Sequence, residues 1–295
     1  LMDSAHIQES DVRYINKRRL KRNLGLIKPL YTTKDAERCL KRFKPLPYGS
    51  EFYLNDELSF HFSDVGHITG SAAVHITSHE EGKNTVLSFT GDVGRYTDLL
   101  LKSPEPFIQS DYIICESTYG DKLHDQQEDA AVKLLEVVAN TCVEKKGKLI
   151  IPAFSLGRTQ EIVFVLDKLK NEGKLPNIKI FVDSPLSVSA TEIVRKHPEA
   201  FNEELREYIK KDPDPFGFNN LTYIQDSTES KELNEIEEPC IIISASGMAD
   251  AGRVKHHIRN SISDPKNTIL MVGFCAPFTL GARLLEGQKE VHIFG

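Results

Sequence analysis

The second half of the sequence alternates strand-like apolar runs with helical segments, and this alternation constrains the fold more than any other feature. Four apolar runs of strand length occur in order, at 148–154, 178–182, 240–244 and 268–272. Helical periodicity follows each of them after a short loop or a longer polar stretch, at 159–169, 188–196, 253–260 and 280–286. Two further helices are expected at 126–145 and 198–210, and the acidic stretch 226–238 is expected to be a solvated helix or linker. Repeated strand–loop–helix units predict an α/β fold with a parallel sheet.

The first part of the sequence predicts a different architecture. Residues 1–45 have a helical pattern that breaks around 25–33. Residues 58–62 alternate apolar and polar side chains at period two, and the neighbouring runs in 51–92 also indicate sequential strands. The run 112–115 predicts one more short, buried strand. The sequence therefore divides near residue 116 into a β-rich region and an α/β region.

The composition of the 295 residues indicates a globular protein, with 40% hydrophobic and 27% charged residues. No apolar run approaches the roughly 20 residues that a membrane span needs, so we expect no membrane association. The five cysteines are widely spaced and form no CxxC pair, which disfavours a disulfide framework or a cysteine zinc site. We expect reduced thiols in a cytoplasmic protein. The sequence starts inside a helical pattern and stops in a strand-like run, so we also expect a fragment of a longer protein.

Positive charge is concentrated near the start of the sequence. Residues 13–44 hold twelve Lys or Arg but only Asp35 and Glu37 as acids, a local charge of +10 in a chain of net charge −6. Such a segment is typical either of a patch that faces a polyanion or of a solvated helical face. The charge pattern alone leaves both interpretations open.

Three residues with metal-binding or acid–base chemistry follow three predicted strands. His67 stands in Gly66-His-Ile-Thr-Gly-Ser71, Asp92 follows Gly91, and Glu116 follows the 112–115 strand. Side chains at neighbouring strand ends can converge, and imidazole and carboxylate groups are ligands for zinc or manganese. The alternative is ordinary turn chemistry, because Gly-Asp is common in turns and a lone histidine is usually structural.

Four loops that follow the α/β strands contain residues suited to phosphate. They are 155–159, 183–187, 244–253 and 273–281. Ligands gather at the carboxyl ends of parallel strands, and helix N-termini rich in Ser, Gly and Arg bind phosphate. The alternative is helix capping, with Arg158 and Arg253 each paired to an acid of its own layer. Gly247 to Gly252 matches the start of a P-loop, but Arg253 and Val254 replace the required Lys and Ser/Thr, which excludes a nucleotide triphosphatase.

These motifs, in this order, resemble the β-CASP branch of RNA-processing nucleases in the metallo-β-lactamase superfamily, over nearly the whole sequence. The matching segments are 66–71, 89–95, 115–120, 151–161, 183–186, 244–253 and 272–280. The resemblance implies a partial metallo-β-lactamase αβ layer in 1–118, a β-CASP domain with a parallel, Rossmann-like sheet in 119–290, and a return to the first domain in 291–295. It also implies RNA as partner and a possible homodimer.

The resemblance assigns roles to individual residues. His67 is similar to a zinc ligand of the family, Asp92 to the carboxylate that bridges two metals, and Glu116 to the acid that orients a catalytic histidine. The RNA-facing wall that the resemblance implies consists of Ser155, Arg158, Ser246, Gly247 and Arg253. The family's HxHxDH motif does not occur in this sequence and is expected before residue 1, with further histidine motifs after Gly295. His256 and His257 are expected to belong to a packed or solvated helical face.

By this resemblance the full protein is a zinc-dependent RNA nuclease with two zinc ions, and this chain carries only part of the site. Whether it is an endonuclease or an exonuclease stays open. One rival hypothesis is a non-catalytic β-CASP scaffold that binds RNA or a protein. Another is a metal-dependent hydrolase of DNA or small phosphoesters.

Overall fold

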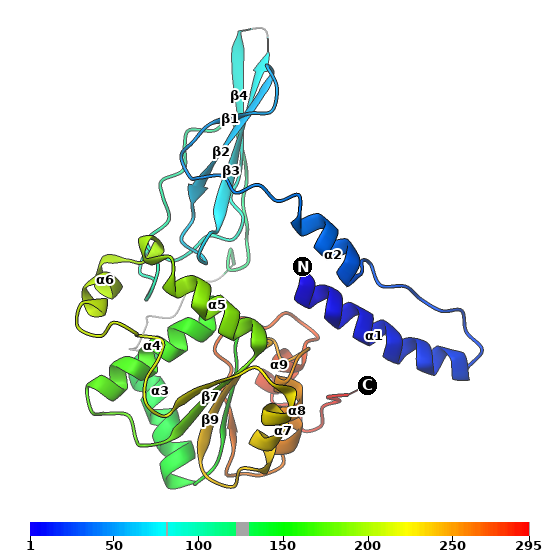
Figure 1. The fold of residues 1–295 in the computed structure, drawn as a ribbon, viewed down its shortest axis with the longest axis vertical. Coiled ribbons are helices and arrows are strands. Elements are labelled where there is room, and N and C mark those ends of the chain that lie inside the picture. The colour runs from blue at the N-terminus through cyan, green and yellow to red at the C-terminus, as the bar shows by residue number, and fades with distance from the viewer. Residues whose placement is uncertain (81, 122–129, 295) are drawn as a thin grey trace. The chain divides into compact units, whose positions relative to one another are not determined.

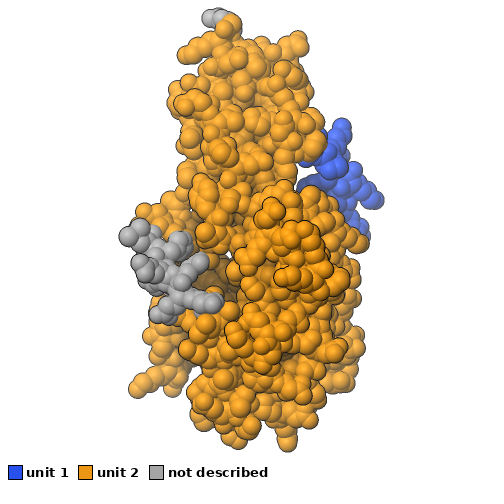
Figure 2. Space-filling model, turned by 90° about the vertical axis from the view of Figure 1, so that its left-hand side faces the viewer, with its two compact units in different colours: residues 1–46 blue, residues 47–295 orange. Residues whose placement is uncertain are grey.

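Two five-stranded sheets organise the chain, one antiparallel for the most part and one parallel (Figure 1). The computed structural model describes residues 1–80, 82–121 and 130–294. Contacts divide these residues into two compact units, 1–46 and 47–295, which Figure 2 shows in different colours. Both sheets belong to the second unit. The domain boundary that we predict at 118 is a separate matter and stays a prediction.

The first unit is a pair of helices, as the broken helical pattern predicts. Helix α1 (Met2–Lys21) and helix α2 (Thr33–Leu40) each bury one alanine, Ala5 and Ala36. Thr32 caps α2, since its side chain accepts a hydrogen bond from the backbone N–H of Asp35, whose carboxylate accepts one in return.

The first sheet of the second unit has the order β1-β2-β3-β4-β5. Its strands are β1 (Phe52–Tyr53), β2 (Leu58–Asp64), β3 (Ala72–Glu80), β4 (Lys83–Phe89) and β5 (Tyr112–Ile114). Strands β2 and β4 are both antiparallel to β3, and β5 is parallel to β4. Strands β2, β4 and β5 therefore run in one direction, and their carboxyl ends lie at one edge of the sheet.

The alternation predicted in β2 is present, but the polar side chains are the buried ones. Ser59, His75 and Ser88 are fully buried on one face of the sheet. His75 explains this arrangement, because its two ring nitrogens bond to the hydroxyls of Ser63 (2.8 Å) and Ser88 (2.7 Å). Buried polar groups are tolerated when they are hydrogen-bonded in this way.

Strand β5 corrects one prediction. A strand does form here, but its three residues are exposed rather than buried. The reason is its position at the edge of the sheet, where it pairs only with β4. An apolar run of strand length does not distinguish an edge strand from a central one.

The second sheet is entirely parallel and has the order β10-β6-β9-β7-β8, which confirms the predicted α/β class. Its strands are β6 (Leu149–Pro152), β7 (Lys179–Asp183), β8 (Leu221–Ile224), β9 (Cys240–Ser244) and β10 (Thr268–Ile269). The sequence patterns did not indicate β8, and β10 is shorter than the run 268–272. The connecting helices are α3 (Ala130–Val138), the π-helix η1 (Ala139–Glu144), α4 (Arg158–Asn171), α5 (Pro185–Arg195), the 3-10 helix η2 (Pro198–Ala200), α6 (Glu203–Ile209), α7 (Ser227–Glu235), α8 (Val254–Ser261) and α9 (Leu280–Leu285). The start of the predicted 126–145 helix, residues 126–129, lies outside the described residues.

Helices cover both faces of the parallel sheet (Figure 1). In β6, Leu149 and Ile151 join the apolar core with α3 and α4, whereas Ile150 joins the core with α7, α8 and α9. Strands buried on both faces read as continuous apolar runs, which is why the sequence located them well. Among the described residues, no helix is long and apolar enough to cross a membrane.

Candidate metal centre and nucleic-acid interface

The carboxyl ends of β2, β4 and β5 bring the three predicted chemical residues together. His67 follows β2, Asp92 follows β4 and Glu116 follows β5. The Nε2 atom of His67 lies 3.7 Å from Oδ2 of Asp92, and the two side chains are 43% and 73% exposed. Glu116 is close enough for the charge of His67 to act on its carboxylate. The convergence that the strand-end positions predicted is therefore present.

Close backbone packing fixes the loop that carries His67. Gly66 has a φ of +61°, and a Cβ atom there would lie 2.4 Å from the carbonyl oxygen of Lys102. A Cβ atom at Gly94 would lie 2.0 Å from the carbonyl oxygen of Gly66. Only glycine fits such approaches. The hydroxyl of Ser71 then accepts hydrogen bonds from the N–H groups of His67 (3.1 Å) and Ile68 (3.2 Å).

Glu116 is held in place by backbone groups. Its Oε1 accepts a hydrogen bond from the N–H of Val93 at 2.7 Å, and its own N–H donates to Oγ1 of Thr90 at 3.1 Å. Burial acts to raise the pKa of Glu116, but hydrogen bonds from Val93 and Thr118 outweigh it and hold the pKa below its usual range. The carboxylate is therefore ionised and oriented by the N–H of Val93, the residue that follows Asp92.

The donors present here do not complete a zinc site. Two ligands of a tetrahedral zinc ion at ~2.1 Å are separated by about 3.4 Å, which is near the 3.7 Å between His67 and Asp92. A zinc ion takes about four donors, however, and the described residues contain no group of three or more His, Cys, Asp or Glu side chains that could hold a metal. The pair fits part of a metal centre and not a whole one.

A pocket adjoins His67 and reaches the start of α4. Its lining includes His67, Asp98, Gly157, Gln160 and Glu161. Burial raises the pKa of Glu161, and the neighbouring positive charge of Arg158, with which it forms an ion pair, opposes that rise. Glu161 is thus a half-buried acid in the pocket that adjoins His67, and the sequence assigned it no role beyond membership of the segment 151–161 and of a helix. Its signal in the sequence is the i, i+3 pairing with Arg158.

The five residues predicted to face RNA all lie at the carboxyl edge of the parallel sheet. Ser155 and Arg158 follow β6, and Ser246, Gly247 and Arg253 follow β9, the parallel neighbour of β6. The hydroxyl of Ser155 lies 3.2 Å from that of Ser184. The Ser246 hydroxyl accepts a hydrogen bond from the N–H of Ala251 at 3.2 Å.

Close packing also marks this edge. A side chain at Gly247 would come within 2.7 Å of the Phe154 ring, and one at Gly157 would meet Ile68 at 3.2 Å. The second contact shows that the loop after β6 lies against the loop that carries His67.

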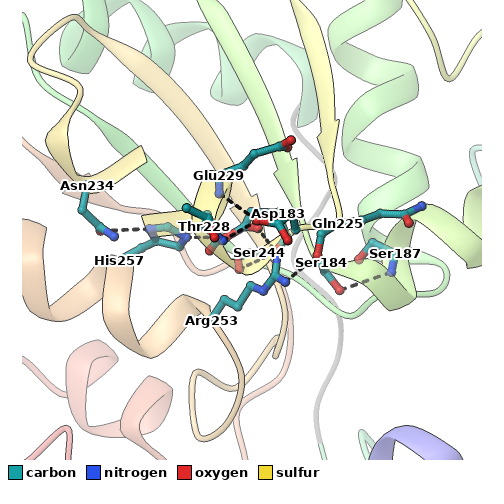
Figure 3. A network of polar contacts seen from close by, with 12 residues as sticks. Asp183, Ser184, Ser187, Gln225, Thr228, Glu229, Asn234, Ser244, Arg253 and His257 are labelled. Carbon is teal, nitrogen blue, oxygen red and sulfur yellow. Dashed lines mark hydrogen bonds and ion pairs between the residues drawn. The ribbon is translucent and has the colours of Figure 1, made fainter. Parts of the chain in front are cut away.

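Arg253 belongs to a buried network centred on Asp183 (Figure 3). One guanidinium nitrogen of Arg253 donates to Oδ1 of Asp183 at 2.7 Å, and His257 contacts Oδ2 at 2.7 Å. Ser230 donates a third hydrogen bond to Asp183, at 2.6 Å. Burial acts to raise the pKa of Asp183, but hydrogen bonds from His257, Ser230 and Arg253 lower it below the usual value. Arg253 and Arg158 are thus both paired with acids, the arrangement that the capping alternative describes.

The same network places the two adjacent histidines. His256 is exposed and His257 is 1% exposed, so helix α8 has one solvated and one packed histidine, as predicted. The partner of His257 was not predicted, because Asp183 is 74 residues away in the sequence. Pattern reasoning recognises a buried helical position but not the acid that a distant strand brings to it.

Comparisons with known proteins agree with this geometry. Residues 159–284 match a family model described as the Beta-Casp domain. The chain is 31% identical over 267 residues to Ribonuclease TTHA0252 of Thermus thermophilus, covering 90% of this chain and 60% of that protein. It is 32% identical to an RNase J-like protein of Methanocaldococcus jannaschii, with the same coverages. It is 33% identical to Transcription termination factor FttA of that archaeon, covering 89% of this chain and 41% of that protein.

These matches identify the class of protein. The chain carries a Beta-Casp domain at residues 159–284, and its similarity to the relatives named above extends over about 90% of the chain. It spans between about two fifths and three fifths of the length of the relatives described above.

Proposed function

We propose that the whole protein is a metal-dependent RNA nuclease and that its metal is zinc. The observation that carries this proposal is the approach of His67 and Asp92 to 3.7 Å beside an ionised, backbone-held Glu116. The names of two relatives, a ribonuclease and an RNase J-like protein, support RNA as the substrate.

In this proposal His67 and Asp92 are metal ligands, and Glu116 holds the loop after β4 in position. Carboxylate and imidazole are both suited to zinc. In this proposal the remaining donors come from outside the residues that the structure describes, whose own side chains do not complete a site. We therefore assign no chemical step to this chain alone.

The proposed RNA-binding edge consists of Ser155, Arg158, Ser246, Gly247 and Arg253. Arg158 is the best placed of them, since its loop lies against the loop of His67 and its side chain is 29% exposed. Arg253 is 23% exposed and bonded to Asp183, so in this proposal it mainly holds the loop after β9 in shape. Backbone N–H groups at the starts of α4 and α5 supply further phosphate donors.

A non-catalytic scaffold that binds RNA is the second candidate function. One relative is named a transcription termination factor, a name that states no cleavage, and this supports the scaffold. The two candidates differ in one property, because a scaffold retains RNA binding without cleaving RNA.

The test is the substitution Asp92→Ala in the whole protein. We expect RNA cleavage to fall by at least about 100-fold, because a metal-bridging carboxylate acts on the reaction itself. We also expect bound zinc to decrease and the melting temperature to stay nearly unchanged, since Asp92 is 73% exposed. Asp56→Ala is the matched control, because Asp56 is exposed and lies before β2, away from the strand end that carries His67.

Three outcomes separate the hypotheses. Retained cleavage in Asp92→Ala would reduce Asp92 to turn chemistry. RNA binding without cleavage by the unaltered protein would establish the scaffold. Cleavage of a DNA strand of the same sequence, with RNA left intact, would establish the third alternative, a hydrolase of DNA.

We further propose that the protein acts in the cytoplasm and forms a homodimer. All five cysteines are unpaired, which suits a reducing compartment. Sedimentation of the whole protein at two concentrations tests the dimer.

A further inference from the structure

The last three turns of helix α1 present a basic surface that the proposed nuclease site does not use. Lys17, Arg18 and Lys21 are exposed, and Tyr14 beside them is 56% exposed. The guanidinium of Arg18 lies 5.8 Å from the centre of the Tyr14 ring. These four residues are called the α1 basic face below.

The opposite side of α1 is occupied by the chain's own return segment, residues 22–32. The side-chain amide of Asn16 exchanges two hydrogen bonds of 2.9 Å with the backbone of Ile27. The N–H of Leu30 donates to Oε1 of Gln8 at 3.2 Å. At 3.6 residues per turn, Gln8 and Asn16 lie on one side of the helix and the α1 basic face on the other.

The positive charge of this face has no acidic partner among the residues that the structure describes. Across 1–80, 82–121 and 130–294, no acidic side chain lies within 4.0 Å of the charged group of Lys17, Arg18 or Lys21. Favourable interaction with the helix dipole explains cations in the last turn only. Lys17 lies before that turn, so the dipole does not account for the whole face.

We infer that the α1 basic face binds the backbone of single-stranded RNA. Lys17 and Lys21 are four residues apart, which is about one turn of the helix and a rise of about 6 Å. Their two ammonium groups can therefore contact successive phosphates. An exposed tyrosine with an adjacent arginine is the combination on which unpaired bases stack. The inference rests on the proposed function for the identity of the polyanion, but it uses residues other than those assigned to the candidate nuclease site.

An anionic membrane is the other polyanion that a basic helix can contact. Helices that lie on membranes carry Trp, Phe or Leu along the face opposite to their basic residues. In α1 that opposite face contains Val12 together with Gln8, Asn16 and Arg19, and these three polar side chains are bonded to the return segment. This arrangement favours RNA.

The test measures RNA binding by the full chain, in EDTA so that cleavage cannot contribute. The probe is a fluorescently labelled single-stranded RNA of mixed sequence, and binding is followed by anisotropy across a series of salt concentrations. The test variant is Lys17→Gln/Arg18→Gln/Lys21→Gln, in which glutamine keeps a good helix propensity. The control variant, Lys196→Gln/Lys211→Gln/Lys266→Gln, loses the same charge at three exposed positions of the second unit.

We expect the test variant to bind RNA on the order of 100-fold more weakly near 0.1 M salt, and its salt slope to fall by about 2, because each phosphate contact contributes about 0.7 to the slope. The control should stay within about threefold of the unaltered chain, and both variants should melt at the same temperature as that chain.

Three results would overturn the inference. The first is equal binding by the test and control variants, which would leave the proposed nuclease function intact. The second is no RNA binding by the unaltered chain, which would count against both proposals. The third is binding to vesicles of phosphatidylserine and phosphatidylcholine, lost in the test variant while RNA binding is unchanged, which would assign the face to membranes.

Discussion

At the scale of single residues, the most unusual acid lies away from the candidate site, in helix α4. The side chain of Asp167 is fully buried, and its Oδ2 accepts a hydrogen bond from the hydroxyl of Tyr208 at 2.7 Å. Its other oxygen has no hydrogen-bond partner among the described residues. Burial raises the pKa of Asp167 to about 6, above its ordinary value of 3.8. The folded chain therefore holds a proton on this carboxyl under conditions in which the unfolded chain has released it.

This difference predicts a specific pH dependence of stability. The carboxyl favours the folded state below pH 3.8, and that contribution is lost as the pH rises through about 6. Asn cannot ionise, so Asp167→Asn should gain stability relative to the unaltered chain between pH 4 and pH 7, by about 1–3 kcal/mol in total. Urea unfolding at several pH values measures the free energy of unfolding of both proteins, and thus the difference between them. The exposed Asp56→Asn should show no such trend, and a constant difference for Asp167→Asn across the range would contradict the prediction.

At the scale of elements, the loops that contain Gly66 and Gly94 pack against each other next to His67, and this packing positions the candidate metal centre. Gly94 and Gly66 approach so closely that a side chain at Gly94 would lie 2.0 Å from one backbone oxygen and 2.7 Å from the N–H nitrogen of His67. Both neighbours are backbone atoms, which cannot move aside as a flexible side chain can. The loops that carry His67 and Asp92 are therefore positioned by each other.

The substitution Gly94→Ala tests this coupling. We expect a loss of about 1–3 kcal/mol in the free energy of unfolding, typical of forcing extra atoms into a packed region. Gly273→Ala is the matched control, because a side chain there meets nothing within 4 Å. Denaturant unfolding of both variants gives the comparison. Equal stabilities would show that the loops adjust independently.

The burial of each strand explains which strands the sequence could predict and which it could not. Strands β6, β7 and β9 are buried on both faces, so their apolar runs located them well. Strand β8 has an exposed threonine and only one buried residue, and no apolar run marks it. For β5, pairing at the sheet edge, which is a tertiary property, left an apolar run exposed.

The candidate site was predictable to a similar degree. Their positions after predicted strands indicated His67, Asp92 and Glu116, the first two directly after a glycine, and the structure brings these three together. Contacts between distant segments, such as that of Asp183 with His257, depend on how strands and helices assemble, and no local pattern encodes them.

At the scale of the whole molecule, the chain divides its charged chemistry between two places. The proposed metal donors lie at the strand ends of the first sheet, and the greatest density of positive charge lies in the unit 1–46. The relatives described above are longer than this chain, which covers 60% of the Thermus ribonuclease. A chain with two exposed donors, His67 and Asp92, can contribute to a zinc centre without forming one.

The small number of metal donors leads to a prediction about the zinc content of the chain. The 295-residue chain, purified with zinc present and then dialysed, should retain well under two zinc ions per chain, because each zinc requires about four donors and the described residues offer no group of three. Elemental analysis gives the ratio directly. His67→Ala is the informative variant, since any weakly held zinc at the His67–Asp92 pair should disappear with it, whereas His6→Ala, an exposed histidine of α1, should change nothing. Two stoichiometric zinc ions that survive dialysis would contradict the prediction. They would show that this chain alone completes the metal centre, with donors that its strand ends do not bring together.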